Sequence, residues 1–376
     1  MNRKQFIILL VLVVVVGGAG LLVRQRGQTS WQSGGQAIGQ KLLPNLAVND
    51  IAQINIKSAT GELNLAKRDN FWRVRERADY PANFAEISGL LLKFSELKIA
   101  QSQEVGASQL GRFELLPPTA GANAGTLVAL KDQAGKALAT LLLGKKHQSK
   151  SGDQSWPDGR FVMTGMGAKS LAVISDPLDN VQAKPESWLN KDFLSIESPR
   201  SIAVQFAQAT NSWKLTRASE TNDRQLADAK ADEKLDSAKI SSVTSPFSAA
   251  SFSDVSALTA SNAPNGTTLT VETFDGFTYV AKIGASENGN YPVNFAVRAK
   301  LAVERIAAKD EKPADKATLD QEFKDRQAKL NEKFAREKLC ESWVYFLPAG
   351  SVDSGIKPKN ELLGEVAKET LSPAGK

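Results

Sequence analysis

The feature that most constrains this chain is an uninterrupted apolar run near its N-terminus. Residues 6–23 read FIILLVLVVVVGGAGLLV and contain no charged side chain. As a helix that rises about 1.5 Å per residue, this run comes close to the roughly 30 Å hydrocarbon core of a bilayer. It therefore predicts a single transmembrane helix. The anchor residues would include Phe6, Leu10, Val14, Leu21 and Val23.

The flanking charges predict how this helix is oriented. Residues 1–5 form a short basic tail with Arg3 and Lys4, which favours a cytoplasmic N-terminus in a bacterial inner membrane. The bulk of the chain would then be periplasmic or otherwise extracytoplasmic. The alternative is a cleaved signal peptide, but apolar residues continue beyond the small residues 17–20 as far as Arg24, which favours an uncleaved anchor.

Polar segments are predicted on both sides of the body. Residues 24–47 are rich in Gln, Gly and Ser over most of their length and predict a flexible tether. Residues 351–376 are expected to form a C-terminal tail. The body between them would consist of two units, residues 48–197 and 198–350.

The two units share a pattern that indicates an internal duplication. Short alternating apolar segments predict early strands at residues 54–56, 63–65 and 71–75 of the first unit, and at 202–206 and 213–217 of the second. The second unit would thus have lost one early strand. Trp72 and Trp213 would each face a core, and stacking on a ligand is the alternative.

A helix and further strands are expected after these segments in each unit. Residues 84–97 have apolar side chains at helical spacing, and Asn83 with Glu86 resembles a capping box. The pattern ISxLxxxFS at residues 87–95 recurs as ISxVxxxFS at 240–248. We therefore predict an α+β fold with two tandem strand-rich units, each with one packed amphipathic helix, preceded by the transmembrane helix.

The second unit also carries a charged insertion, at about residues 301–341, that the first unit lacks. Pro313 is expected to separate a short helix from a longer one. Partner docking is predicted for the apolar residues at helical spacing, which are Leu319, Phe323, Leu330 and Phe334. The alternative is a salt-bridged helix that folds back onto its own domain.

Motifs of catalysis are present only as fragments. The chain has one cysteine and one histidine, which excludes a disulfide framework and a thiolate metal cluster. Its net charge of +6 comes from scattered Lys and Arg, so no nucleic-acid partner is expected. Phosphate-loop and dinucleotide fingerprints are absent. We therefore predict no catalytic residue, no cofactor and no metal site.

Two such fragments occur in the sequence. Ser95 and Lys98 fit a Ser-x-x-Lys pattern, in which lysine activates a serine nucleophile, and this leaves a cell-wall hydrolase as a remote alternative. Ser95 lies late in the predicted helix, however, and no Ser-x-Asn element follows. His147 lies among several lysines with no carboxylate nearby in sequence, which predicts a surface loop histidine.

The order of these segments resembles the family of the domain of unknown function 4340. The resemblance covers about residues 48–200, and the second unit only loosely. It implies an auxiliary envelope subunit of the kind often encoded beside ABC-transporter components of the gliding-motility type, and it offers no catalytic residues to carry over. The motifs that carry it are residues 55–57 (NIK), 71–74 (FWRV), 80–81 (YP), 142–145 (LLGK), 159–162 (GRFV) and 187–189 (SWL).

The expected function is that of a non-catalytic accessory or scaffold subunit of an ABC-type transporter complex, with a permease or auxiliary subunit as its partner. The alternative is an envelope module that binds a glycan or peptide in a cleft between the two units. If the insertion docks a partner, deletion of Lys309 to Arg336 should leave folding intact and reduce recovery of the complex.

Overall fold

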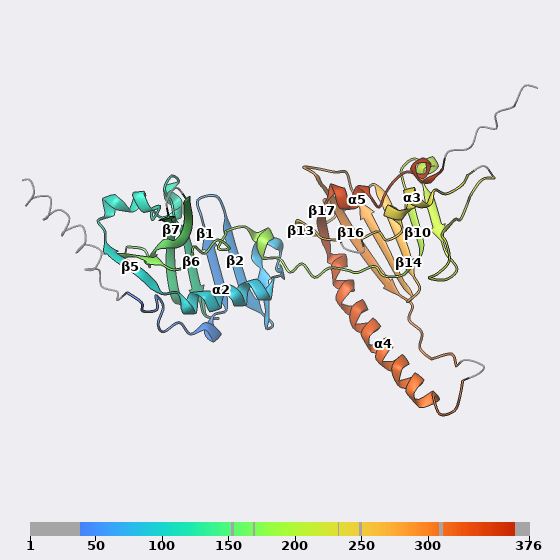
Figure 1. Cartoon of the computed structure of the whole chain (residues 1–376), viewed down its shortest axis with the longest axis horizontal. Helices are drawn as coiled ribbons and strands as arrows, with labels where there is room; N and C mark the ends of the chain where they lie inside the picture. Colours follow the sequence, from blue (N-terminus) through green and yellow to red (C-terminus); the bar gives the residue numbers. More distant parts are fainter. Residues whose placement is uncertain are drawn as a thin grey trace, which may run out of the picture. The chain divides into compact units, whose positions relative to one another are not determined.

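The computed structural model describes residues 38–151, 154–167, 170–231, 233–247, 250–307 and 311–364. The predicted transmembrane helix and its anchor residues lie outside these ranges. Within them, no helix is both long and apolar enough to cross a membrane. The chain divides after Asn190 into two compact units, each built on a large antiparallel sheet (Figure 1). The predicted α+β class is confirmed.

The first unit is a nine-stranded sheet in the order β4-β3-β2-β1-β6-β7-β8-β9-β5. Alternation of apolar and polar residues explains its early strands, since Ile54 and Ile56 are fully buried while Lys57 is exposed. The strands are β1 (Gln53–Lys57), β2 (Glu62–Arg68), β3 (Phe71–Val74), β4 (Tyr80–Pro81), β5 (Ile99–Glu104), β6 (Thr126–Lys131), β7 (Ala137–Ser151), β8 (Gln154–Thr164) and β9 (Ser170–Ile174).

The predicted helix of the first unit is confirmed as α2 (Phe84–Glu96), which runs along this sheet in Figure 1. Asn83 caps it, because its side-chain oxygen accepts hydrogen bonds from the amides of Ala85 and Glu86. Ile87, Leu90, Leu91 and Phe94 are buried, as the helical spacing predicts. Phe84 is 67% exposed, so the apolar face begins one turn later than expected.

The first sheet also buries side chains of a second apolar cluster. Alternate residues of β7, β8 and β9 meet Leu115, which follows the 3-10 helix η3 (Ala107–Phe113). The cluster comprises Leu115, Leu142, Phe161, Met163, Leu171 and Val173. Burial on both faces explains why these strands read as nearly continuous apolar runs.

The second unit is an eight-stranded sheet in the order β12-β11-β10-β14-β15-β16-β17-β13. The strands from β1 to the edge strand β5 follow the same order in the first sheet as the strands from β10 to the edge strand β13 in the second. The strands are β10 (Pro199–Gln205), β11 (Trp213–Thr216), β12 (Gln225–Leu226), β13 (Asp254–Ala257), β14 (Thr267–Thr273), β15 (Phe277–Ile283), β16 (Asn290–Ala299) and β17 (Trp343–Pro348).

Trp72 and Trp213 lie on strands that do not correspond in position. Trp213 begins β11, which pairs directly with β10, whereas Trp72 lies in β3, which pairs with β2. By position, β11 therefore corresponds to β2. The strand without a counterpart is the short edge strand β4, because the second sheet ends at β12. Both tryptophans are buried, as expected.

The predicted amphipathic helix of the second unit is also wrong. In the described residues up to 247, the segment forms only α3 (Ser237–Ile240) and a 3-10 turn, η7 (Ser241–Val243). Pro246 disfavours helical backbone at Ser245, and the serine-rich sequence prefers local hydrogen bonds to helix propagation. The shared ISx pattern therefore did not produce a shared helix.

The unit boundaries differ from those expected. Residues 191–197 belong to the second unit, where Phe193 contacts the rings of Phe252, Phe295 and Tyr345. The predicted tether is shorter, because residues 39–42 bond to the chain next to β5 and Leu42 is buried. The predicted tail begins later, because residues up to 364 pack in the second unit.

A projecting helical arm as candidate interaction site

The charged insertion forms an arm between β16 and β17. Its single helix, α4 (Lys316–Lys338), runs away from the sheet of the second unit in Figure 1 and is followed by η8 (Leu339–Ser342). The predicted helical hairpin is wrong, since residues 300–307 and 311–315 contain no helix. A short helix there would have no sheet to pack against, and isolated short helices are marginal in water.

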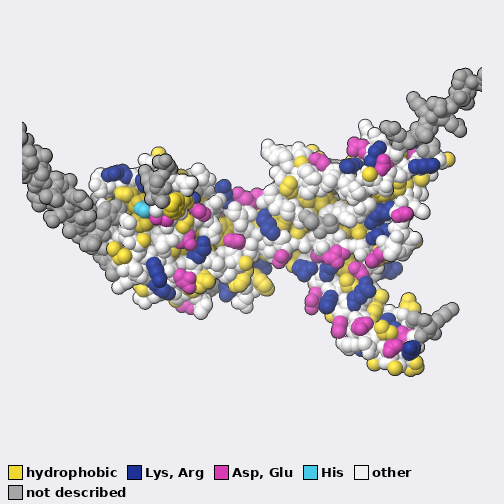
Figure 2. Space-filling model, in the orientation of Figure 1, with side chains coloured by type: hydrophobic (Ala, Val, Ile, Leu, Met, Phe, Trp, Pro, Cys, Tyr) yellow, Lys and Arg dark blue, Asp and Glu magenta, His cyan; other side chains and the backbone are white. Residues whose placement is uncertain are grey.

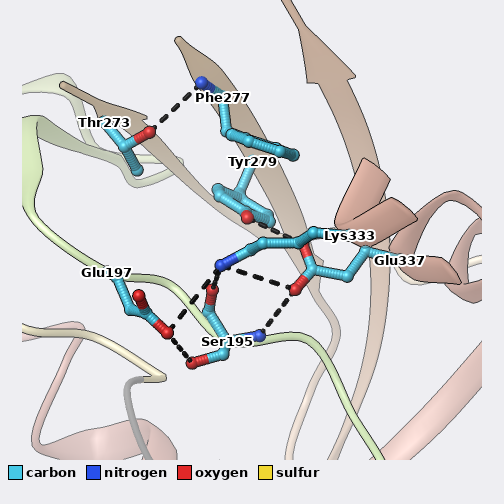
Figure 3. A network of polar contacts seen from close by, with 7 residues as sticks. All are labelled: Ser195, Glu197, Thr273, Phe277, Tyr279, Lys333 and Glu337. Carbon is cyan, nitrogen blue, oxygen red and sulfur yellow. Dashed lines mark hydrogen bonds and ion pairs between the residues drawn. The ribbon is translucent and has the colours of Figure 1, made fainter. Parts of the chain in front are cut away.

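The base of the arm is a buried polar network around Glu337 (Figure 3). Glu337 is only 1% exposed. Its carboxylate accepts hydrogen bonds from the Tyr279 hydroxyl, at 2.7 Å, and from the Ser195 amide, at 3.0 Å. A buried carboxylate is tolerated only when its oxygens are satisfied in this way. The network thus joins the last turn of α4 to β15 and to the segment that enters the unit.

Lys333, one turn earlier on α4, completes this base. Its ammonium group donates to the Ser195 carbonyl at 2.6 Å and lies 3.7 Å from the Glu337 carboxylate. It also stands 5.6 Å from the ring centre of Phe277, in β15. Because three elements share one network, the direction in which α4 leaves the sheet is set by side-chain contacts rather than by the loop.

Tyr279 gives this network a spectroscopic test. Burial, followed by the hydrogen bond to Glu337 and its negative charge, raises the pKa of Tyr279 above its usual value of 10.0. The phenol therefore contributes stability that is fully present below about pH 10 and is lost as the pH rises further. Tyr279→Phe is expected to leave unchanged the phenolate absorbance that develops between about pH 10 and pH 11 in the folded protein. Circular dichroism at pH 8 checks that the variant is folded. Loss of one tyrosine's absorbance in this range would contradict the assignment.

The four residues predicted for docking lie along α4 and are all half-buried. Phe334 belongs to the base, because its ring packs edge-on against the ring of Phe277, with 6.3 Å between the two ring centres. Leu319, Phe323 and Leu330 are half-buried along α4. These three leave part of their apolar surface in contact with solvent and extend the apolar face outward from the base.

The most exposed apolar side chains of the arm are two residues that sequence reasoning did not select. Val303 is 92% exposed and Ile306 is 95% exposed, more than any other large hydrophobic residue in the described ranges. Arg305 between them is held by Asp320 of α4, at 2.7 Å, and by Glu311. Figure 2 shows hydrophobic side chains along the outer part of the arm. In the sequence they are two apolar residues three positions apart with charged residues between them. This spacing was assigned to the short helix that was expected before Pro313.

The residues of the catalytic fragments have local contacts in the structure. The Ser95 hydroxyl donates to the Leu92 carbonyl of its own helix at 2.7 Å. Burial raises the pKa of the Cys340 thiol, which keeps it protonated. Groups of His, Cys, Asp and Glu that could hold a metal ion are absent from the part of the chain that the structure describes.

The predicted setting of His147 is wrong in two respects. It lies in β7 rather than in a loop, and its Nδ1 is 2.6 Å from a carboxylate oxygen of Asp158 in β8. The partner is eleven residues away in sequence and is brought opposite by the hairpin. The ring also meets Phe161 edge-on at 5.6 Å. These contacts orient the histidine on the hairpin.

The motifs of the family resemblance have packing roles. Trp188 is 2% exposed, and its indole N–H donates to the Gln182 carbonyl at 3.1 Å. Its own carbonyl accepts from the amide of Asn83, the cap of α2, at 2.8 Å. Gly144 is required because a Cβ there would overlap the Phe113 carbonyl, and Arg160 donates to the Gly144 carbonyl at 2.8 Å.

Comparisons with known proteins identify the family. The family model described as Domain of unknown function (DUF4340) matches residues 72–269, from β3 of the first unit to β14 of the second. The comparison with curated proteins and the comparison with solved structures found no match. Because the matched range covers more than half of the 376 residues, the chain belongs to the DUF4340 family.

Proposed function

We propose that this protein is a membrane-anchored, non-catalytic accessory or scaffold subunit of an ABC-type transporter complex, and that the arm binds a permease subunit. The observation that carries the proposal is the exposure of Val303 and Ile306 beside a fixed Arg305. Large apolar side chains that a folded unit leaves exposed are typical of protein-binding sites.

The arm is suited to binding a folded partner. Its base is fastened by Glu337 and Lys333, so little conformational entropy would be lost when its outer part is bound. Arg305 is paired with two carboxylates, so the 301–307 loop offers apolar surface without an uncompensated cation. The complementary surface on the partner is an apolar groove with a polar rim.

The anchor determines which kind of partner is accessible. Residues 6–23 have the length and composition of a transmembrane helix, which would keep the arm close to proteins of the same membrane. A permease meets this condition, with an extracytoplasmic loop as the contact. The matching strand order of the two sheets also supports an internal duplication, to which the second copy has added the arm.

Replacement of both exposed residues tests the proposal. Recovery of the complex from mild detergent by the tagged full chain is expected to fall at least tenfold in the Val303→Ser, Ile306→Ser variant, because the central apolar contacts of an interface supply most of its affinity. The free energy of unfolding should change by less than about 0.5 kcal/mol, since both side chains are exposed. Co-purified permease and ATPase subunits would be quantified by mass spectrometry.

The matched control is Met166→Ser, which removes another exposed apolar side chain, 61% exposed, from the first unit. Equal recovery with the arm variant and this control would contradict the role of the arm. A wild-type chain that purifies alone and binds wall fragments would support the binding-module alternative instead. Point substitutions are preferable to deletion of residues 309–336, because that deletion removes Lys333 and would disrupt the base of the arm.

A further inference from the structure

The second unit contains a polar cavity of about 540 Å³ at the start of β10. Two arginines from the segment around β11 and β12 line it, Arg217 and Arg224, and serine and threonine hydroxyls form much of the remaining wall. Figure 2 shows several Lys and Arg side chains on the side of the second unit where Figure 1 labels β10 and β14. The hydroxyl-bearing residues are Ser198, Ser237, Ser241, Thr244 and Ser245.

Both arginines are positioned by backbone oxygens. Arg217 donates to the Pro199 carbonyl at 2.8 Å, and Arg224 donates to the same oxygen at 3.1 Å. Arg224 also donates to the Thr244 carbonyl at 3.0 Å, and Arg217 lies over the ring of Phe274. Because the two guanidinium groups share one acceptor, they lie side by side with like charges. Backbone oxygens fix their direction without neutralising them.

At least one N–H donor of the two arginines has no hydrogen-bond acceptor in the described part of the chain. Arg224 Nη1 is buried and has no hydrogen-bond acceptor among the described residues. Neither guanidinium group forms an ion pair with a carboxylate there. A buried donor without an acceptor costs free energy, and a bound water or anion is one way in which such a donor is satisfied. Burial, and next to it the charge of Arg217, lowers the pKa of Arg224 to about 10, which still leaves it charged at neutral pH.

We propose that this cavity binds the phosphate group of a small phosphorylated ligand. Two adjacent guanidinium groups carry the charge that balances a phosphate monoester, and their planar forks match phosphate oxygens. The hydroxyl of Ser245, which also lines the cavity, can donate to one of the remaining oxygens. The volume exceeds that of phosphate alone, so it has room for the organic part of the ligand as well.

Glu220 and Asp223 also line the cavity, and their charges oppose an anion. Both are exposed, so water and salt screen them more strongly than the partly buried arginines. Glu220 contributes its backbone carbonyl to Arg217, at 2.6 Å, rather than its carboxylate. These carboxylates can accept hydrogen bonds from hydroxyl groups on the organic part of the ligand.

The proposal is tested by titration calorimetry of the full chain in mild detergent with inorganic phosphate, up to about 10 mM, at constant ionic strength. Wild-type protein is expected to bind phosphate. Arg217→Gln should weaken binding at least tenfold, because it removes a charge-assisted contact. Ser245→Glu should do the same by placing a competing carboxylate in the cavity, and it leaves both arginines in position. Arg298→Gln, at an exposed position of β16, is the matched control and should bind like wild type.

Further arms of the experiment distinguish the source of the phosphate group. Tighter binding of glycerol phosphate than of inorganic phosphate indicates a soluble ligand, whereas tighter binding of vesicles with phosphatidic acid than of phosphatidylcholine vesicles indicates a lipid headgroup. Circular dichroism checks that each variant is folded. The proposal is overturned if wild-type protein binds none of these probes, or if Ser245→Glu binds them as tightly as Arg298→Gln does.

Discussion

Replacement of Glu337 by alanine is expected to lower the free energy of unfolding of the second unit by about 3–5 kcal/mol, the usual cost of removing one partner from a buried ionic network. The change would leave the Tyr279 hydroxyl and the Ser195 amide without their acceptor and Lys333 without its nearest carboxylate. Urea denaturation of the full chain, followed by circular dichroism, measures the loss. Hydrogen exchange of β15 and of α4 shows whether the loss lies in the second unit.

Glu332→Ala is the matched control, because Glu332 lies on the same helix and is exposed. Its substitution should change the free energy of unfolding by less than about 0.5 kcal/mol. If both variants were equally stable, Glu337 would not be a structural support of the arm.

Replacement of Trp188 by alanine should destabilise the first unit by a similar amount, about 3–5 kcal/mol, because it opens a cavity in the core. It also removes the indole donor to the Gln182 carbonyl and loosens the backbone that bonds to the cap of α2. The measurement is again the urea midpoint of the full chain, with hydrogen exchange of α2 as the local readout.

Trp156 offers a control of the same residue type in the same unit. It is 44% exposed on the β7–β8 hairpin, so Trp156→Ala should have little effect on the urea midpoint. If Trp188→Ala proved as stable as Trp156→Ala, packing would not explain the motif at residues 187–189. The hydrogen bond from the Asn83 amide to the Trp188 carbonyl predicts instead that Trp188→Ala is the less stable of the two variants.

The residues of the family motifs pack within the first unit, whereas the arm and the arginine-lined cavity belong to the second unit. Trp188 and Gly144 contribute to packing in the first unit. The arm has no counterpart there, and the Arg217–Arg224 cavity lies in the second unit as well.

Most of the strand content was predictable from the sequence, because a half-buried strand must alternate apolar and polar residues along its length. The alternation in β1 and β6 and the helical spacing of α2 are local properties, and Asn83 marked where that helix begins. The same reasoning failed at residues 240–248. A few matching positions predicted a helix there, and Pro246 within the same window prevented it.

What only the tertiary structure decided are contacts between residues far apart in sequence. Glu337 reads as one more charge on a charged helix, and its burial depends on Tyr279 and Ser195 being placed around it by other elements. His147 meets Asp158 through the register of a hairpin, and Arg217 and Arg224 converge on Pro199 because β10 and β11 pair. Periodicity along one segment specifies which face is apolar, but it carries no information on which distant group will satisfy a polar atom.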